Sequence, residues 1–247
     1  MTGTYRIGDQ MIEICSLYPA VHDYCRDYRT EGAPVFSVKT TPEDLVFEKE
    51  RSEQIGGLPF QTDPEIRNKE LEILAVYRQI AEQMPFRDTF LFHGSAIAVD
   101  GAGYLFTAKS GTGKSTHARL WRKMLGDRAV MINDDKPLIR ITEDGAMVYG
   151  TPWNGKHRLG TNAVVPLKAV CILGRGERNS IRGITREEAF PMLVQQSYRP
   201  LDPAALAKTM TLVDRLSRTV PLYRLECNMD PEAAELSYNT MKEATRQ

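Results

Sequence analysis

The residues from Ala108 to Ser115 have the order and spacing of a phosphate-binding loop. They fit the pattern of a glycine-rich turn followed by lysine and then serine or threonine, with alanine at the first position. Gly111 and Gly113 would allow consecutive backbone N–H groups to point at phosphate oxygens. Lys114 would bring a positive charge to the β- and γ-phosphates, and the Ser115 hydroxyl would bind Mg²⁺. The stretch therefore predicts a site for ATP and Mg²⁺, made by Ser110, Gly111, Thr112, Gly113, Lys114, Ser115 and Thr116.

Two adjacent carboxylates, Asp134 and Asp135, follow the apolar run from Ala129 to Ile132. Such a run predicts a buried strand, and α/β sheets bind ligands beyond the carboxyl ends of their strands. Because adjacent strand residues point to opposite sides, the two carboxylates would have different roles. One would hold Mg²⁺ beside Ser115, and the other would accept a proton from an incoming hydroxyl group. A solvated Asp-Asp turn is the alternative without chemistry.

The segment 149–160 combines glycines and a proline with Trp153 and three side chains that can carry positive charge. Cations near a transferred phosphoryl group stabilise its developing negative charge. Lys156 and Arg158 are the predicted cations, whereas His157 fits a functional or a structural role equally. Trp153 would cover the site or contact a substrate side chain. An ordinary turn, with Trp153 in the core and the basic side chains in water, is the alternative.

Strand and helix signals surround these residues in the order that a phosphate-binding loop requires. The run 103–107 is short and apolar, as in a buried strand, and 115–126 has apolar residues at helical spacing before Gly126. The hydrophobic patterns, capping signals and Asp-Pro helix starts predict strands at 89–99, 169–173, 180–184 and 221–227, and helices from 185, at 202–217 and from 230 to about 245. These elements together predict a mixed α/β fold.

The chain divides into two predicted parts. Residues 1–64 mix short strand-like runs with glycine and proline, which is typical of a small β-rich or α+β module. A helix is predicted from 64 to about 84, because its apolar residues fall on one face. It would begin the second part, residues 65–247, which holds the phosphate-binding loop and ends in helices.

The composition excludes several classes of partner. The 32 basic and 32 acidic residues give a net charge of zero, and no basic patch or tail indicates nucleic-acid binding. No apolar run reaches the ~18 residues of a membrane span, and the N-terminus has no signal-peptide pattern. The four cysteines are scattered, as expected for thiols in a reducing compartment. We therefore expect a cytoplasmic protein without nucleic-acid or membrane partners, and leave open a homo-oligomer.

Four motifs in sequence order carry a resemblance to a known family: His93-Gly94-Ser95-Ala96, a hairpin at 99–103, the loop 110–115 and Asp134-Asp135. Over residues 88–175 the chain resembles the catalytic domain of HPr kinase/phosphorylase, which is related to the phosphoenolpyruvate carboxykinases. The resemblance implies a core with a mixed β-sheet and flanking helices, and ATP-dependent phosphorylation of a serine. It also implies that Asp134 is the general base, Asp135 is a metal-proximal carboxylate and His93 is a partner of the acid/base machinery.

The segment 149–160 departs from that family, because a true HPr kinase has a glycine-rich, arginine-bearing segment after its catalytic core. The chain thus resembles more closely the small HPr-kinase-like enzymes that modify other substrates, including kinases that tailor lasso peptides at a serine. We expect an ATP-dependent kinase that acts on a serine of a peptide or small protein. Its catalytic residues would be Asp134, His93, Lys114, Lys156 and Arg158, and its metal ligands Ser115 and Asp135. A nucleotide-binding regulator or scaffold of the same fold is the alternative.

Overall fold

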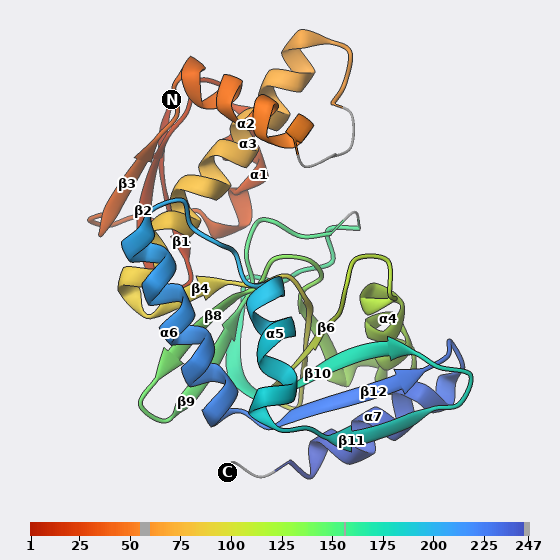
Figure 1. Ribbon diagram of the computed structural model, residues 1–247. Helices are drawn as coiled ribbons and strands as arrows, with labels where there is room; N and C mark the ends of the chain where they lie inside the picture. Colours follow the sequence, from red (N-terminus) through yellow and green to blue (C-terminus); the bar gives the residue numbers. More distant parts are fainter. Residues whose placement is uncertain (55–59, 156, 245–247) are drawn as a thin grey trace. The chain divides into compact units, whose positions relative to one another are not determined.

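The computed structural model describes residues 1–54, 60–155 and 157–244. The chain forms two compact units, a first unit of residues 1–83 and a second unit of residues 84–247 (Figure 1). Among the described residues no helix is long and apolar enough to cross a lipid bilayer. No disulfide joins any of the four cysteines in this part of the chain.

The first unit contains a three-stranded sheet in the order β1-β2-β3. β1 (Thr2–Ile7) and β2 (Gln10–Cys15) are antiparallel and are joined by Gly8 and Asp9. Both joining residues have φ near 60°, the backbone of a two-residue turn that matches the twist of a hairpin. β3 (Phe36–Lys39) pairs with β2 in parallel, after α1 (Ala20–Tyr24) and a 3₁₀ turn at Arg26–Tyr28.

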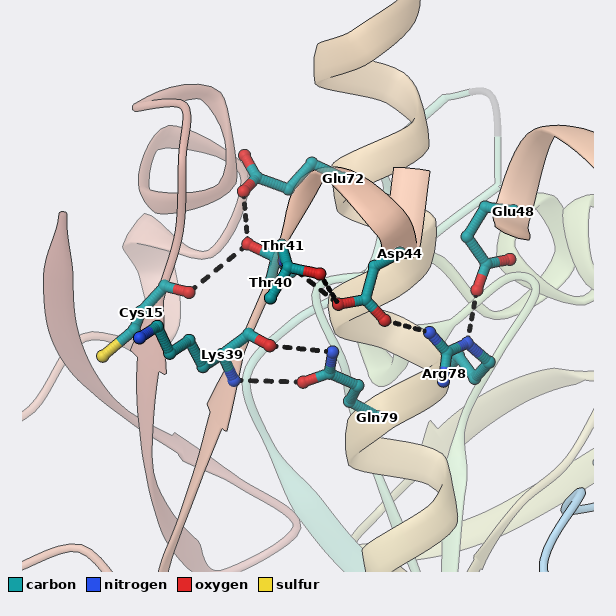
Figure 2. Close-up of polar contacts among 9 residues, drawn as sticks. All are labelled: Cys15, Lys39, Thr40, Thr41, Asp44, Glu48, Glu72, Arg78 and Gln79. Carbon is teal, nitrogen blue, oxygen red and sulfur yellow. Dashed lines mark hydrogen bonds and ion pairs between the residues drawn. The ribbon is translucent and has the colours of Figure 1, made fainter. Parts of the chain in front are cut away.

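Two helices, α2 (Pro42–Gln54) and α3 (Pro64–Gln83), complete the first unit. Figure 2 shows how α3 is tied to its neighbours by polar contacts. Glu72 is fully buried and accepts hydrogen bonds from the backbone N–H groups of Leu17 and Tyr18 and from the hydroxyl of Thr40. Arg78 pairs with Asp44 and Glu48 of α2, and Gln79 bonds both backbone groups of Lys39. These contacts place the boundary between the units after α3, whereas the sequence analysis set it before this helix.

In the second unit the described residues form a nine-stranded mixed sheet with the order β4-β8-β9-β10-β6-β5-β7. β12 pairs with β10, and β11 pairs with β12. The long strand β10 pairs antiparallel with β9 through its first residues, and parallel with β6 and β12 further along. The strands are β4 (Thr89–Leu91), β5 (Ser95–Val99), β6 (Ala102–Thr107), β7 (Ala129–Asn133), β8 (Leu138–Thr142), β9 (Gly145–Tyr149), β10 (Val164–Arg175), β11 (Ser180–Gly183) and β12 (Leu222–Cys227).

Helices cover both faces of this sheet, so its central strands are buried on both sides. Leu105 and Val170 point to a core with α5 (Arg186–Gln196) and α6 (Pro203–Thr219), while their neighbours Tyr104 and Phe106 point to a core with α4 (Lys114–Leu125) and α7 (Pro231–Lys242). Figure 1 shows α5 and α6 together on one side. Burial on two faces explains why these strands read as continuous apolar runs.

The mixed α/β fold with flanking helices agrees with the prediction, including β6, α4 and β7 around the phosphate-binding loop. The predicted side-chain caps are present at Thr185 of α5 and Asp202 of α6, whereas Asp230 is the N-cap residue of α7 without a side-chain cap hydrogen bond. The predicted strand 89–99 is two strands, β4 and β5, which pair with different partners. The sequence analysis did not predict α2 or β8.

Candidate active site

Three motifs that are far apart in the sequence meet at one edge of the sheet. β5 lies between β6 and β7 and is antiparallel to both. The end of β6, the start of β5 and the end of β7 therefore share an edge, and the two outer strands are about 10 Å apart. This edge collects the phosphate-binding loop, His93-Gly94-Ser95 and Asp134-Asp135. Gly94 suits the crowded start of β5, because a Cβ there would lie 2.8 Å from the carbonyl oxygen of Phe106.

The loop after β6 enters α4 through backbone conformations that favour glycine. Gly111 and Gly113 have φ of 76° and 125°, where a side chain would be strained. Gly113 is the N-cap residue of α4, and no side chain of the described residues caps this helix. By contrast, Thr185 caps α5 and Asp202 caps α6 with side-chain hydrogen bonds. The first N–H groups of α4 are thus open to an anion, which the helix dipole also attracts.

Lys114, the first residue of α4, is almost completely buried. Its Nζ donates a hydrogen bond of 3.2 Å to the carbonyl oxygen of Ala108. Burial lowers the pKa of Lys114, and the negative charges of Asp135 and Asp134 partly oppose that shift. Ala108 itself is fully buried in the core, which fits a small residue at the first position of the loop. The arrangement keeps a cation inside the loop, where a phosphate group would meet it.

Asp134 is buried and its carboxylate is held by a neighbour from β5. Ser95 donates a hydrogen bond of 2.7 Å from Oγ to Asp134 Oδ1. The segment 149–160 passes closely over the same side chain, because a Cβ at Gly155 would lie 3.3 Å from Asp134 Oδ2. One carboxylate oxygen is therefore fixed by a hydroxyl, and the other lies close to the backbone of Gly155.

Asp135 faces a different set of groups. Its Oδ1 lies 3.4 Å from His93 Nε2 and 3.4 Å from Lys136 Nζ. Burial lowers the pKa of His93 to about 4, and the positive charges of Lys136 and Lys114 act in the same direction. His93 is therefore neutral at pH 7 and contacts Asp135 as an uncharged imidazole.

Asn133, the last residue of β7, organises the turn that carries both carboxylates. Its Oδ1 accepts hydrogen bonds from the backbone N–H groups of Asp135 and Lys136, at 2.8 and 2.6 Å. Its Nδ2 donates to the hydroxyl and carbonyl oxygens of Thr151 at 2.9 and 3.2 Å. Since Asn133 is fully buried, it locks the Asp-Asp turn to the segment 149–160.

A cavity of about 470 Å³ opens on one side of the phosphate-binding loop, and we call it the loop cavity. It is lined by residues 111–113, by α4, by the end of β10 and by the segment after β12. Arg175, the last residue of β10, donates a hydrogen bond of 2.6 Å to the carbonyl oxygen of Gly111. Leu120, Leu173 and Met229 give the cavity apolar walls, which suit an aromatic ring.

A second cavity of about 520 Å³ lies on the other side, and we call it the aspartate cavity. α4 presents one row of side chains to it, and Asp134 is the one acidic residue among the described residues that line it. The lining residues are Ser115, Thr116, Arg119, Arg122, Met131, Asp134, His157 and Leu159. Thr116 lines both cavities, so they meet at the first turn of α4.

The structure brings most of the predicted site residues to this edge, although not all of them. Ser110 is exposed in the loop, while Thr112 and Gly113 line the loop cavity. Arg158 is exposed with a φ of 47° and lines neither cavity, whereas His157, which was given no preferred role, lines the aspartate cavity. Lys156 lies outside the described residues.

Several residues that shape the site were missed in the sequence analysis. Ser95 was quoted only as part of a motif, and Asn133 was read as the end of an apolar strand. Arg119 and Arg122 were not predicted as site residues, although Ser115, Arg119 and Arg122 have the i, i+4, i+7 spacing of one helix face. That spacing was a readable signal. Arg175 gave no comparable signal, because its contact depends on how β10 ends beside the loop.

The oxygen groups at the start of α4 fit Mg²⁺ bound together with a nucleotide. Among the described residues, no three His, Cys, Asp or Glu side chains gather to hold a metal by themselves. Mg²⁺ bound with ATP needs few protein ligands, because phosphates and waters supply the others. Ser115 shares the aspartate cavity with Asp134, whereas Asp135 is beside His93 and Lys136. A hydroxyl and a nearby carboxylate are the hard oxygen ligands that Mg²⁺ prefers.

Comparisons with known proteins identify the family. The family described as SynChlorMet cassette protein ScmC matches residues 61–232, and the chain belongs to this family. No curated protein matches the sequence. Among solved structures, the Hpr(Ser) kinase/phosphatase from Coxiella burnetii is similar with a TM-score of 0.35 and 11% identical residues. That alignment covers 61% of this chain and 95% of the other.

Proposed function

We propose that this member of the ScmC family is an ATP-dependent kinase that transfers the γ-phosphoryl group to a serine hydroxyl of a peptide or small protein. The observation that carries the proposal is the uncapped first turn of α4, with Lys114 buried beneath it and a cavity on each side. Such a turn binds phosphate, and a transferase needs separate spaces for donor and acceptor. The sequence resemblance to small HPr-kinase-like enzymes supports the same reading.

The nucleotide would enter from the loop cavity. Its phosphates would accept hydrogen bonds from the N–H groups at the start of α4, and Lys114 would add a positive charge. The N–H group of Thr112 would not take part as it stands, because it donates to the carbonyl oxygen of Lys109. The apolar walls of the loop cavity suit the base. Arg175 supports this role as a positioning residue, because its hydrogen bond to the carbonyl oxygen of Gly111 ties the end of β10 to the loop.

Mg²⁺ would be held by phosphate oxygens together with the Ser115 hydroxyl and Asp135, the assignment that the family resemblance implies. When bound, the ion neutralises charge on the phosphates and orients them. Asp134 shares a cavity with Ser115, so it is the other carboxylate that could serve the metal. Neutral His93 fits a supporting role, since it contacts Asp135 without adding a positive charge.

The acceptor would occupy the aspartate cavity, where Asp134 is the general base. In the transfer step the serine oxygen forms a bond to the γ-phosphorus, and the bond from phosphorus to the β–γ bridging oxygen breaks. The bonding electrons leave with ADP, and the serine proton passes to Asp134. Ser95 fixes Asp134 for this role through Oδ1 and leaves the remaining lone pairs to the substrate. Lys114 would supply positive charge to the transferred group, and Lys156 is the proposed second cation.

The test is transfer of labelled γ-phosphate from ATP to serine peptides and to a small carrier protein, with Asp134→Asn beside wild type. We expect label on serine with wild type and at least a hundred-fold slower transfer with the variant, because general-base catalysis is worth about 10²–10⁴-fold. Asp127→Asn is the matched control, since it makes the same change at an exposed position after α4.

The alternative regulator gives a different result in the same experiment. ATP would bind, and would protect Cys227 in the loop cavity from alkylation, without label appearing on any acceptor. Burial raises the pKa of the Cys227 thiol, so the alkylation is run at alkaline pH. ATP binding without transfer, unchanged in Asp134→Asn, would reject the kinase in favour of the regulator.

A further inference from the structure

The side chains along one face of α4 run from the phosphate end into the aspartate cavity. Ser115, Arg119 and Arg122 are spaced i, i+4 and i+7, and all three line this cavity. With a rise of 1.5 Å per residue, the two arginines start about 6 and 10 Å along the helix from Ser115. On the proposed function, a group bound beside Arg122 lies beyond the phosphates and belongs to the acceptor.

The charges in this cavity are unbalanced. Neither Arg119 nor Arg122 forms an ion pair with another described residue, whereas Arg78, Arg128 and Arg182 all have carboxylate partners. Among the described lining residues Asp134 is the one acidic group, so a single negative charge faces the two positive charges of the arginines. Two guanidinium groups on one wall, with no counter-charge of their own, select an anionic ligand.

We infer that the acceptor carries a carboxylate close to its serine, and that Arg119 and Arg122 bind this carboxylate while Asp134 faces the hydroxyl. The inference rests on the proposed function for the position of the hydroxyl. Carboxylates are the anions that a peptide offers, and arginine binds them in a bidentate geometry. Met131 and Leu159 line the same cavity and suit the aliphatic part of the acceptor. The carboxylate has two sources, an Asp or Glu next to the serine, or the chain terminus after a final serine.

The experiment compares two pairs of short N-acetylated peptides with wild type, Arg119→Gln and Arg122→Gln. One pair has an internal serine followed by Asp or by Asn, and the other ends in serine as a free acid or as an amide. Lys123→Gln is the control, because it removes a charge from an exposed position of the same helix outside the cavity. Transfer and peptide binding, the latter by calorimetry, are both measured.

We expect wild type to favour the peptide with the carboxylate over its neutral partner in at least one pair. The pair that shows this preference identifies whether the carboxylate comes from a neighbouring side chain or from the chain terminus. Each arginine variant should lower kcat/KM for that acid about ten- to a hundred-fold, mainly through KM, and leave the matched neutral peptide unchanged. Lys123→Gln should keep the wild-type preference. Equal use of acid and neutral peptides by wild type, or equal losses for both in the arginine variants, would overturn the inference.

Binding separates this inference from the proposed function. Acid peptides that bind in an arginine-dependent way without receiving label would support the carboxylate site and reject the kinase. Transfer without any preference for the acid would support the kinase and reject the carboxylate site. If the peptides neither bind nor receive label, both are rejected for peptide acceptors.

Discussion

His117 on α4 is buried in a way that makes the second unit sensitive to acid. Its Nε2 lies 3.0 Å from the Oγ of Ser237, which also accepts from the indole N–H of Trp121 at 2.9 Å. The hydroxyl proton of Ser237 is directed to the carbonyl oxygen of Ala233, so His117 Nε2 must be the donor. Its Nδ1 is then unprotonated, and it has no hydrogen-bond partner among the described residues. A second proton would bury a cation without an acceptor.

Burial accordingly lowers the pKa of His117 from its ordinary 6.5 to about 4. The unfolded chain takes up a proton below pH 6.5, whereas the folded chain takes it up only near pH 4. The contribution to stability is therefore complete above pH 6.5 and is lost as the pH falls toward 4. At about 1.4 kcal/mol per pKa unit, the full loss is about 3 kcal/mol, of which about 2 kcal/mol is lost by pH 5.

The change that tests this is His117→Leu, which removes the titrating ring. Urea unfolding at pH 8 and pH 5 is followed by tryptophan fluorescence, since Trp121 and Trp153 are the two tryptophans and both lie in the second unit. The variant should lose about 2 kcal/mol less than wild type between the two pH values. His157→Leu is the control, because this side chain is exposed. His93 is present in all three proteins and contributes equally. If His117→Leu loses as much stability as wild type, the assignment of the acid sensitivity to His117 is refuted.

Two further changes test the framework that holds the carboxylates. Asn133→Ala should lower the free energy of unfolding by about 2–4 kcal/mol, because it removes five hydrogen bonds worth up to about 1 kcal/mol each. Asn239→Ala at an exposed site should cost less than about 0.5 kcal/mol, and equal urea midpoints for the two variants would contradict this. Gly150→Ala should cost about 2 kcal/mol or more, since its Cβ would lie 2.0 Å from the carbonyl oxygen of Thr161. Gly183→Ala is its control, because a Cβ there meets nothing within 4 Å; similar melting temperatures for both would count against the packing of this segment.

The parts of the fold that could be predicted are those specified by local patterns. The glycines at 111 and 113 require a loop with unusual backbone conformations, and the apolar runs on either side require a strand and a helix. The caps at Thr185 and Asp202 are similarly local. α2 was missed because its exposed face is strongly charged and few of its side chains are buried, so the apolar signal of a helix is weak.

The convergence at the site could not be predicted from local patterns. It depends on β5 pairing antiparallel with β6 and β7, which sequence periodicity does not reveal. The boundary between the two units could not be predicted from local patterns either, because the sequence around Glu72 indicates a solvent-facing residue of a helix. In the structure its carboxylate satisfies backbone N–H groups far away in the sequence, and α3 belongs to the first unit for that reason.

On the proposed function, the position of Thr116 between the two cavities has a consequence for specificity. The nucleotide would approach the first turn of α4 from the loop cavity, and the acceptor would approach it from the aspartate cavity. This suits phosphoryl transfer, in which the attacking and the leaving oxygen lie roughly in line on opposite sides of the phosphorus. The residues that recognise the two substrates then lie on different walls and share only this turn. Changes at Leu120 or Met229 should alter the KM for ATP, and changes at Arg119 should alter the KM for the acceptor. The residues of the two cavity walls can therefore change without changing Lys114 and Asp134, the residues proposed to face the transferred group.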